Sequence, residues 1–400
     1  MDLSYGMAPF FPSDPEGELH AKAFRLTQLS SELNGIAAPQ TRAAVSRMLS
    51  GVNAYYSNQI EGQGTHPINI ERAVQSGLNE IDPDVRITLA LREARNKLAD
   101  YREVEGADIP HITDPDFIRS IHRVIFSDLP DLELRAHAPD GTFSEPIIPG
   151  QWRTKDVQVG KHVAIDHREL ESTMRCFDSH YRLNQPCLRG EMGLIAAAAS
   201  HHRLAHVHPF LDGNGRVTRL FTELYLERVL GEPLHWSLSR GLARHRNLYY
   251  SALREGDMAR ENSYASRGPR SDNGLFNFCN FFLDQCLDQS TYMGKLLSFE
   301  TYKRRVEILV RQACDGGLDD VAILDPRAEN VLKTIYVEGE LSRSEAGRHT
   351  GYQERRARDV IRQLINEGLL ETEGARGSVR PGFPAKYIEY LFPKLAGAAI

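Results

Sequence analysis

Apolar residues recur every three or four positions over most of this chain, which predicts a mainly α-helical protein. Helical patterns run from about residue 18 to 58, over residues 70–105 with a break at Asp82-Pro83, and from 169 to about 253, and resume at Leu275. Alternating apolar and polar residues around Gly160 instead predict a short β-hairpin over residues 155–164. The first eighteen residues contain three prolines and are expected to form an extended arm.

The pattern changes near Asp315, in a stretch rich in Gly and Asp that we interpret as a domain boundary. Residues 322–390 resemble a winged helix–turn–helix. Its first helix is expected to start at Asp325-Pro326, with an acidic N-cap and Pro at the first helical position, and to end at Gly339. The second helix is expected within 342–350 and the third from Gln353 to Asn366, with residues 371–380 as the wing.

Composition narrows the class of protein but does not name a function. Hydrophobic residues make up 41% and charged residues 26% of the 400 residues, as in ordinary globular proteins. The sequence holds no run of eighteen apolar residues and no recognisable signal peptide, and its five cysteines form no CxxC pair. We therefore expect a cytoplasmic protein without a disulfide framework or a cysteine zinc site. The net charge of -6 predicts no global attraction to nucleic acid or membranes.

The most informative stretch is His-Pro-Phe-Leu-Asp-Gly-Asn-Gly-Arg-Val-Thr-Arg, residues 208–219. Helical spacing precedes and follows it, and Gly231 stands where a helix would end, so the motif is expected to be a loop that opens a helix. Gly213 and Gly215 would let the backbone turn and expose successive amides at the positive end of the helix dipole. Arg216 and Arg219 share one face of that helix, which predicts a polyphosphate site.

Acid and base groups flank this predicted site. Asp212 places a carboxylate beside the phosphates, where Mg²⁺ usually takes one protein ligand. His208 lies just outside and could remove a proton from an incoming hydroxyl. His202 and His206, four residues apart, could instead bind zinc, but no third ligand is evident, and two core-facing histidines are the preferred interpretation.

The segment matches every fixed position of the Fic (filamentation-induced-by-cAMP) family signature, HxFx[D/E]GNGRxxR, and the resemblance covers roughly residues 20–300. It includes the hairpin segment from Trp152-Arg153 to His162, Leu-Tyr-Tyr-Ser-Ala-Leu at 248–253, and Gly256-Asp257. The resemblance implies a mostly helical fold with a β-hairpin flap, and transfer of AMP from ATP to a Ser, Thr or Tyr hydroxyl of a protein. The polar insert at 259–274 departs from the shorter family pattern.

The resemblance also implies site residues. His208 would be the catalytic base and Asp212 would hold Mg²⁺, while Arg216 would contact the phosphates and Arg219 the γ-phosphate. The hairpin would align a target segment by strand addition. Tyr249 and Tyr250 would border the nucleoside, with core packing about equally expected for one of them. The remaining residues assigned to ATP binding are Val159, Gly160, Lys161, His162, Gly213, Asn214, Gly215, Val217 and Thr218.

Ser57-Asn-Gln-Ile-Glu61-Gly62 resembles the family's inhibitory motif, [S/T]xxxE[G/N]. Alone, the pattern could simply end a helix. Together with an intact catalytic motif, it predicts that Glu61 pairs bidentately with Arg219 and fills the space that the γ-phosphate needs. ATP would then bind with its α-phosphate misaligned for attack. In some relatives the same glutamate assists removal of AMP, which this sequence leaves open.

The C-terminal module could contact DNA through Arg355, Arg358 and Arg362, spaced on one face of its third helix. Residues 342–386 hold nine Lys or Arg and six Asp or Glu, a local excess of positive charge in an acidic chain. Winged helices also serve as protein-docking or dimer surfaces, so a protein partner and a homodimer stay open.

Taken together, the sequence predicts an N-terminal helical region with the inhibitory motif (1–105), a Fic catalytic core (106–315) and a winged-helix domain (320–400). The leading hypothesis is an autoinhibited protein adenylyltransferase that uses ATP and Mg²⁺ and modifies another protein or itself. The alternatives are a nucleotide-sensing DNA-binding regulator, a metal-dependent phosphohydrolase and a phosphodiesterase that removes AMP. A pure sensor would not need the base His208, which favours catalysis.

Overall fold

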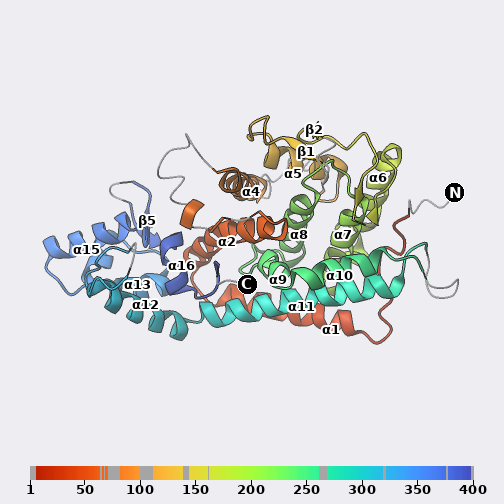
Figure 1. Cartoon of the computed structure of the whole chain (residues 1–400). Coiled ribbons are helices and arrows are strands. Elements are labelled where there is room, and N and C mark those ends of the chain that lie inside the picture. The colour runs from red at the N-terminus through yellow and green to blue at the C-terminus, as the bar shows by residue number, and fades with distance from the viewer. Residues whose placement is uncertain are drawn as a thin grey trace. The chain divides into compact units, whose positions relative to one another are not determined.

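Helices make up most of the chain in the computed structural model (Figure 1). The structure describes residues 6–63, 65–66, 68–70, 82–99, 111–137, 144–160, 162–260, 268–318, 321–374 and 377–397, without the side chains of His137 and Val159. Among the helices described, none combines the length and the apolar character needed to cross a membrane. All five cysteines have free thiols.

The chain divides into two compact units that do not follow chain order. The core unit comprises Met1–Gln28, Asn53–Thr65 and Leu78–Gln289, and the C-terminal unit comprises Leu29–Val52, His66–Gly77 and Ser290–Ile400. The division falls within three helices: α1 (Glu18–Gly35), α2 (Pro39–Ile60) and α11 (Asp272–Leu297). The three-part division expected from the sequence stays a prediction.

The core unit is built around two consecutive helices, α7 (Glu191–Val207) and α8 (Asn214–Leu230), which pack against each other. Both are buried on nearly every face, because other helices cover them. Four alanines, Ala196 to Ala199, are fully buried in α7 and let neighbouring helices approach closely. The helices packed around this pair are α4 (Pro83–Ala99), α5 (Pro115–Phe126), α6 (Leu170–Tyr181) and α10 (Arg246–Asp257).

Shorter elements complete the core unit. The expected hairpin is present: β3 (Gln158–Val159) pairs antiparallel with β4 (His162–Val163), with Val159 opposite His162. A second antiparallel pair joins β1 (Arg135–His137) to β2 (Ser144–Pro146). The other short elements are η3 (His167–Glu169), η4 (Pro186–Leu188) and α9 (Leu238–Arg244).

The C-terminal unit contains α12 (Phe299–Cys314), which packs against α13 (Ala328–Glu338) and α16 (Ala385–Leu391). Tyr302 of α12 stacks on Tyr336 of α13 with ring centroids 3.8 Å apart. Next come α14 (Arg343–Arg348), α15 (Glu354–Asn366) and the antiparallel strands β5 (Leu370–Thr372) and β6 (Val379–Pro381). Three helices followed by a hairpin is the order that the sequence predicts, and their assignment as a winged helix stays an interpretation.

One predicted helix start is wrong. α13 begins at Ala328, because Asp325 uses its carboxylate to accept the amide of Arg327, and its carbonyl to accept the amide of Ala328, in a turn before the helix. The predicted end is correct, since Gly339 caps α13 with a φ of 79°. Ser342 caps α14 with a full capping box to Glu345, as this pair of residue types favours.

Candidate functional site

Residues 208–213 of the motif form the loop between α7 and α8, and residues 214–219 open α8, as expected. His208 ends α7 in the left-handed conformation, with a φ of 50°, and Gly213 precedes α8 with a φ of 78°. Asn214 closes the loop, because its side chain accepts from the amide of Phe210 at 2.9 Å and donates to the carbonyl of Phe210 at 2.8 Å. The side-chain amide of Asn214 therefore holds the loop, and only its backbone N–H remains available to an anion.

The first turn of α8 is suited to bind an anion. Its first backbone N–H groups have no acceptor within the helix, and Gly213 offers no side-chain acceptor to them. The expected turn at Gly215 is wrong, because Gly215 lies within α8. A Cβ at Gly215 would lie 2.1 Å from Oε1 of Glu61. Gly215 is thus needed for the close approach of Glu61 to the helix.

Glu61 and Arg219 form the ion pair that the sequence predicts. Nη2 of Arg219 lies 2.5 Å from Oε1 of Glu61, and the guanidinium is almost fully buried. The expected bidentate geometry is wrong, because the pairing runs through Nη2 and Oε1. Nε of Arg219 instead donates to the hydroxyl of Ser57 at 2.8 Å, and Nη2 also donates to the carbonyl of Ser57 at 2.9 Å. Ser57 thus anchors the arginine from the same helix that delivers the glutamate.

Arg216 is held by two residues that sequence reasoning missed. Its Nε donates to Oδ1 of Asn58 at 2.7 Å, and Nη2 donates to Oε1 of Gln63. Asn58 is itself oriented by donating to the hydroxyl of Thr88 at 2.9 Å. Asn58 lies within the inhibitory motif and Gln63 directly follows it, so the motif itself is the sequence signal that could have identified them. The inhibitory segment therefore binds both arginines of the site.

The charge of Glu61 is stabilised by this arrangement. Burial raises the pKa of its carboxyl, but the positive charges of Arg219 and Arg216 outweigh burial and lower the pKa below its usual range. Glu61 is therefore ionised at neutral pH, and its carboxylate lies beside the first turn of α8.

His208 is neutral at physiological pH. Burial lowers its pKa to about 4, and the positive charges of His162 and Arg153 act in the same direction. A neutral imidazole has a free lone pair, which a base requires. The backbone of His208 is fixed as well, because Nε of Arg153 donates to its carbonyl at 2.9 Å.

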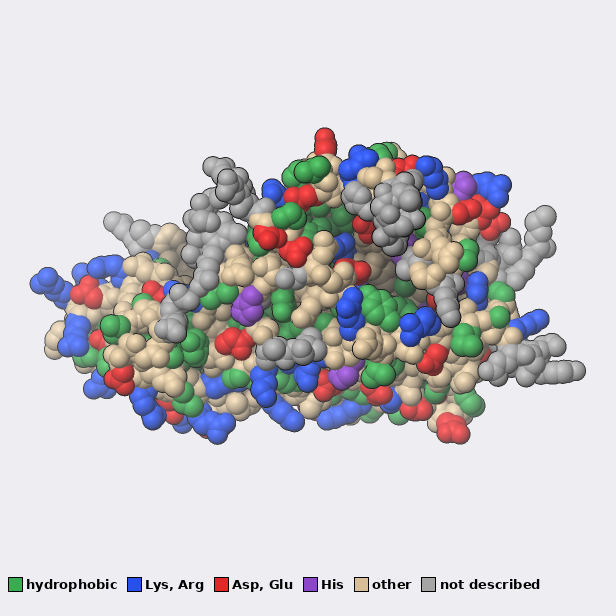
Figure 2. Space-filling view, viewed as in Figure 1, with side chains coloured by type: hydrophobic (Ala, Val, Ile, Leu, Met, Phe, Trp, Pro, Cys, Tyr) green, Lys and Arg blue, Asp and Glu red, His purple; other side chains and the backbone are tan. Residues whose placement is uncertain are grey.

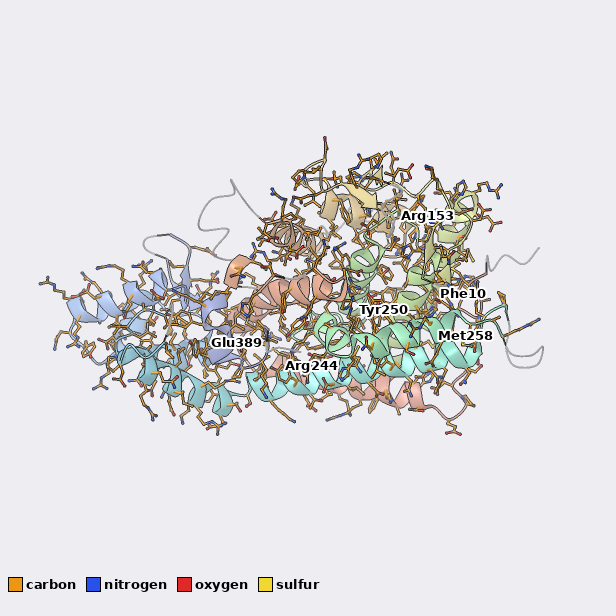
Figure 3. All side chains as sticks on the ribbon, viewed as in Figure 1. Phe10, Arg153, Arg244, Tyr250, Met258 and Glu389 are labelled. Carbon is orange, nitrogen blue, oxygen red and sulfur yellow. The ribbon has the colours of Figure 1, made fainter. Side chains whose placement is uncertain are left out.

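Arg153 also joins the hairpin to this loop. Its Nη1 donates to the carbonyl of Lys155 at 2.8 Å, and Nη2 donates to the carbonyl of Ile165, on the other side of the hairpin. Arg153 is nearly fully buried, and Figure 3 labels it within the core unit. Both ends of the hairpin segment are thus tied to the residue that carries the candidate base.

The other hairpin residues can be placed only in part. Gly160 forms the turn with a φ of 59°, and the carbonyl of Gly160 accepts from the side chain of Gln158 at 2.7 Å. Lys161 and the side chain of Val159 lie outside the described residues. His162 is tied to α7 and α10 by contacts described below.

Asp212 is suited to serve as a protein ligand of Mg²⁺. Its side chain is exposed next to the first turn of α8, and Oδ1 accepts from the amide of Gly213 at 2.5 Å. An exposed carboxylate in that position can give an oxygen to Mg²⁺, which completes its shell with phosphate oxygens and water.

The two tyrosines are placed differently. Tyr249 is buried in the core, where its hydroxyl lies 2.8 Å from Nε2 of His201. Tyr250, labelled in Figure 3, is half-buried, and its hydroxyl donates to the carbonyl of Ile60 at 3.2 Å. Val217 and Thr218 are each 1% exposed, so their side chains belong to the core of the unit.

The histidine pair on α7 is not a two-ligand zinc site. Both ring nitrogens of His202 are used: Nδ1 lies 3.0 Å from Nη1 of Arg203 and Nε2 lies 2.9 Å from the carbonyl of Leu253. His202 is therefore a satisfied core residue, as the preferred interpretation holds. His206 instead lies close to His162 and Asp257, a grouping that the sequence did not reveal.

The conformation of Gly213 leads to a stability prediction. Gly213→Ala would force a side chain into a positive-φ position and place Cβ 2.4 Å from the ring of Phe126. We expect the free energy of unfolding to fall by about 3 kcal/mol, the combined cost of the strained backbone and the overpacked ring. Gly231→Ala is the matched control, because Gly231 has a φ of +75° and a Cβ added there would meet nothing within 4 Å. It should cost only about 1 kcal/mol. Equal losses in urea unfolding would contradict the packing argument.

The candidate DNA-binding arginines lie exposed on α15. Arg358 pairs with Glu354, and Arg362 lies 3.1 Å from Asp359. Arg355 is also exposed. Figure 2 shows Lys and Arg side chains gathered over the elements around α15. A groove of about 580 Å³ runs between α14 and α15, with Gly347, Ala357 and Ile361 among its lining residues and four arginines: Arg343, Arg348, Arg358 and Arg362.

Comparison with known proteins supports the resemblance. Residues 112–226 match the Fic/DOC family model. The chain is 35% identical over 117 residues to the protein adenylyltransferase Fic of Aedes aegypti, covering 28% of this chain and 22% of that protein. It is 26% identical over 184 residues to the protein of the same name from Nematostella vectensis, covering 45% and 38% of the two chains. The chain thus matches about a fifth to two fifths of these curated relatives.

A solved structure shares the fold. Residues 134–508 of Fic-1 from C. elegans superpose with a TM-score of 0.51 at 18% identity, covering 69% of this chain and 71% of that chain. The expected mainly α, Fic-type core with a β-hairpin is therefore confirmed. Residues 112–226, which hold His208, the motif loop and most of α8, are thus a domain of the Fic/DOC family.

Proposed function

We propose that this chain is a protein adenylyltransferase that transfers AMP from ATP to a Ser, Thr or Tyr hydroxyl, on a target protein or on itself. The observation that carries the proposal is the joint geometry of a neutral His208 and an anion-binding first turn of α8 with two arginines. The names of the curated relatives point to the same reaction. We retain the cytoplasm as the proposed compartment.

ATP would bind with its phosphates at the first turn of α8. The backbone N–H groups of Asn214, Gly215 and Arg216 would face the phosphate oxygens, and the helix dipole would favour their charge. Arg216 and Arg219 would contact the phosphates once the inhibitory segment releases them. Asp212 would hold Mg²⁺, which neutralises charge on the phosphates when bound.

His208 would act on the acceptor hydroxyl. As the hydroxyl oxygen attacks the α-phosphorus, His208 takes the hydroxyl proton, a P–O bond to AMP forms, and the bond to pyrophosphate breaks. The hairpin formed by β3 and β4 would align the target by strand addition, because its strand edges can pair with an extended segment. Arg153 would keep the hairpin in register with the base.

Glu61 would inhibit this reaction. Its carboxylate lies against Gly215 and pairs with Arg219, so it competes with a phosphate for the same guanidinium and the same helix end. Bound ATP would have to place its γ-phosphate elsewhere, and the α-phosphate would lose alignment with the attacking hydroxyl. Glu61 could also direct a water that removes AMP, which makes hydrolysis of the product the alternative reaction.

The position of the label in ATP tests the proposed reaction. The Glu61→Gly protein, incubated with Mg²⁺ and ATP, should retain label from the α-phosphate and none from the γ-phosphate. Label from the γ-phosphate would identify a kinase instead. Release of the α-label from modified protein by wild type, but not by Glu61→Gly, would support the AMP-removing alternative.

The arginine-lined groove favours a second function, DNA binding by the C-terminal module. Four arginines from α14 and α15 line a groove whose one acidic lining residue is Glu354. The ion pairs of Arg358 and Arg362 are well exposed and therefore weak, so phosphates could replace the carboxylates. Arg343 donates to the carbonyls of Gly374 and Gly377, which holds the β5–β6 hairpin beside α14. A helix flanked by such a hairpin is suited to the major groove.

Replacing two groove arginines tests this function. In the full chain, the double variant Arg358→Ala and Arg362→Ala should weaken binding to duplex DNA. The slope of log affinity against log salt should become shallower by about 2, because two phosphate contacts are lost. The matched control replaces Arg304 and Arg311, two exposed arginines on α12, and should leave binding unchanged. No binding by wild type at low salt would contradict DNA binding and favour a protein partner.

A further inference from the structure

Three titratable side chains from separate elements meet in the core unit next to the candidate base. They are His162 on β4, His206 near the end of α7, and Asp257, the last residue of α10. Nδ1 of His206 lies 2.6 Å from Oδ1 of Asp257, and Nδ1 of His162 lies 3.3 Å from Oδ2. The two rings are tilted against each other with centroids 4.7 Å apart. One carboxylate thus links the hairpin to α7.

The contacts of His162 define which of its nitrogens carry hydrogen. Nε2 lies 2.8 Å from the carbonyl of His206, which can only accept, so Nε2 must donate. Nδ1 faces the carboxylate of Asp257, which also accepts. The His162 ring therefore donates to the carbonyl of His206 and turns Nδ1 toward the carboxylate of Asp257, 3.3 Å away.

The carboxylate of Asp257 carries the negative charge of this cluster. Burial raises the pKa of its carboxyl, but the hydrogen bond from His206 and the nearby histidines lower it to about 2, so the group is ionised. Its backbone carbonyl accepts from Nη1 of Arg270 at 2.9 Å, and the carbonyl of Gly256 accepts from Nη1 of Arg203 at 3.2 Å. These bonds fix the end of α10 just before Met258, which Figure 3 labels.

The cluster is poorly suited to a metal ion. A histidine that binds a metal usually donates its other N–H to an acceptor. Nε2 of His206 is buried without a hydrogen-bond partner among the described residues. If His206 bound a metal through Nδ1, it would leave a buried N–H unsatisfied, which is costly. With Nδ1–H donated to Asp257, Nε2 carries only a lone pair.

We propose that Asp257 is a positioning residue that holds the β3–β4 hairpin at a fixed distance from His208 through the side chain of His162. The carbonyl that binds His162 belongs to His206, two residues before His208. Arg153 fixes the hairpin on its other side, and its own amide donates to the carbonyl of Pro209 at 3.0 Å. The hairpin is therefore anchored both to the last turn of α7 and to the motif loop. This inference rests on the proposed AMP transfer, because the distance between the hairpin and His208 matters for that reaction.

Hydrogen exchange of the hairpin amides over residues 156–164 tests the anchor without ATP or target. Asp257→Asn should speed exchange about tenfold, because the carboxylate charge that faces His162 is lost. Asp257→Glu, which keeps the charge, should restore much of the protection. Asp315→Asn is the matched control, because Asp315 also lies at a helix end, and should leave the hairpin unchanged. Unchanged exchange in a folded Asp257→Asn protein would overturn the proposal.

Self-modification kinetics in the Glu61→Gly background test the positioning role. Adding Asp257→Asn should lower the maximal rate about tenfold and leave the half-saturating ATP concentration within about twofold, because the hairpin and not the nucleotide moves. His162→Gln, which keeps the donor to the carbonyl of His206, should lose less than His162→Ala. An unchanged maximal rate despite faster exchange would overturn the positioning role. If Glu61→Gly itself transfers no AMP, the proposed function fails, and exchange alone decides on the anchor.

Discussion

Glu61→Gly is expected to raise the rate of AMP transfer about 10- to 100-fold, the range that corresponds to losing one charged hydrogen bond that competes with ATP. Glu61 pairs with Arg219 at 2.5 Å and lies against Gly215, so its removal frees both the guanidinium and the helix end for phosphate. Glu61→Gln, which keeps the shape and loses the charge, should give an intermediate rate. The measurement is the mass gain of one AMP on intact protein, followed over time with Mg²⁺ and ATP.

The chain offers a close control for this change. Glu16 is an exposed turn residue followed by Gly17, whose φ of 72° resembles the 82° of Gly62 after Glu61. Glu16→Gly should therefore add the same backbone freedom without touching the site, and its rate should equal that of wild type. Equal rates for wild type and Glu61→Gly would contradict the inhibitory role of Glu61. An increase in the Glu16 variant would show that backbone freedom, and not the carboxylate, controls the rate.

His208→Asn is expected to lower transfer in the Glu61→Gly background about 100- to 10,000-fold, the usual contribution of a positioned general base. Asparagine suits the test because His208 has a φ of 50°, a conformation that asparagine tolerates better than alanine. The fold and the phosphate site should survive, so the variant should still bind ATP. Label from the α-phosphate would follow transfer, and equilibrium binding of ATP would follow the site.

The same base leads to a pH expectation. Since the pKa of His208 is lowered to about 4, the ring stays neutral above that value. Its ionisation should therefore leave the rate of transfer unchanged between pH 6 and 8.

The matched control for His208→Asn is His111→Asn, at an exposed histidine before α5, which should transfer AMP normally. Retention of transfer by a folded His208→Asn protein would mean that another group takes the hydroxyl proton.

Much of the fold could be read from the sequence because its signals are local. The helices on either side of the motif loop, the hairpin around Gly160 and the caps of α14 and α13 all depend on neighbours within a few residues. The start of α13 was missed because Asp325-Pro326 suits a turn as well as a helix N-terminus. The turn expected at Gly215 was wrong for a different reason. Gly215 is needed because Glu61 lies against it, and a contact with a residue so distant in the chain leaves no local sequence pattern.

The same distinction between local and long-range contacts applies to the site. The sequence by itself determined which groups share one helix end, because the offsets between His208, Asp212 and Arg219 are short and Arg216 and Arg219 share one face of α8. Only the tertiary structure decided that Asn58 and Gln63 bind Arg216 across more than 150 residues, that Tyr249 is a core residue, and that Asp257 meets two histidines. Such contacts depend on how helices pack, and packing is set by side chains far apart in the chain.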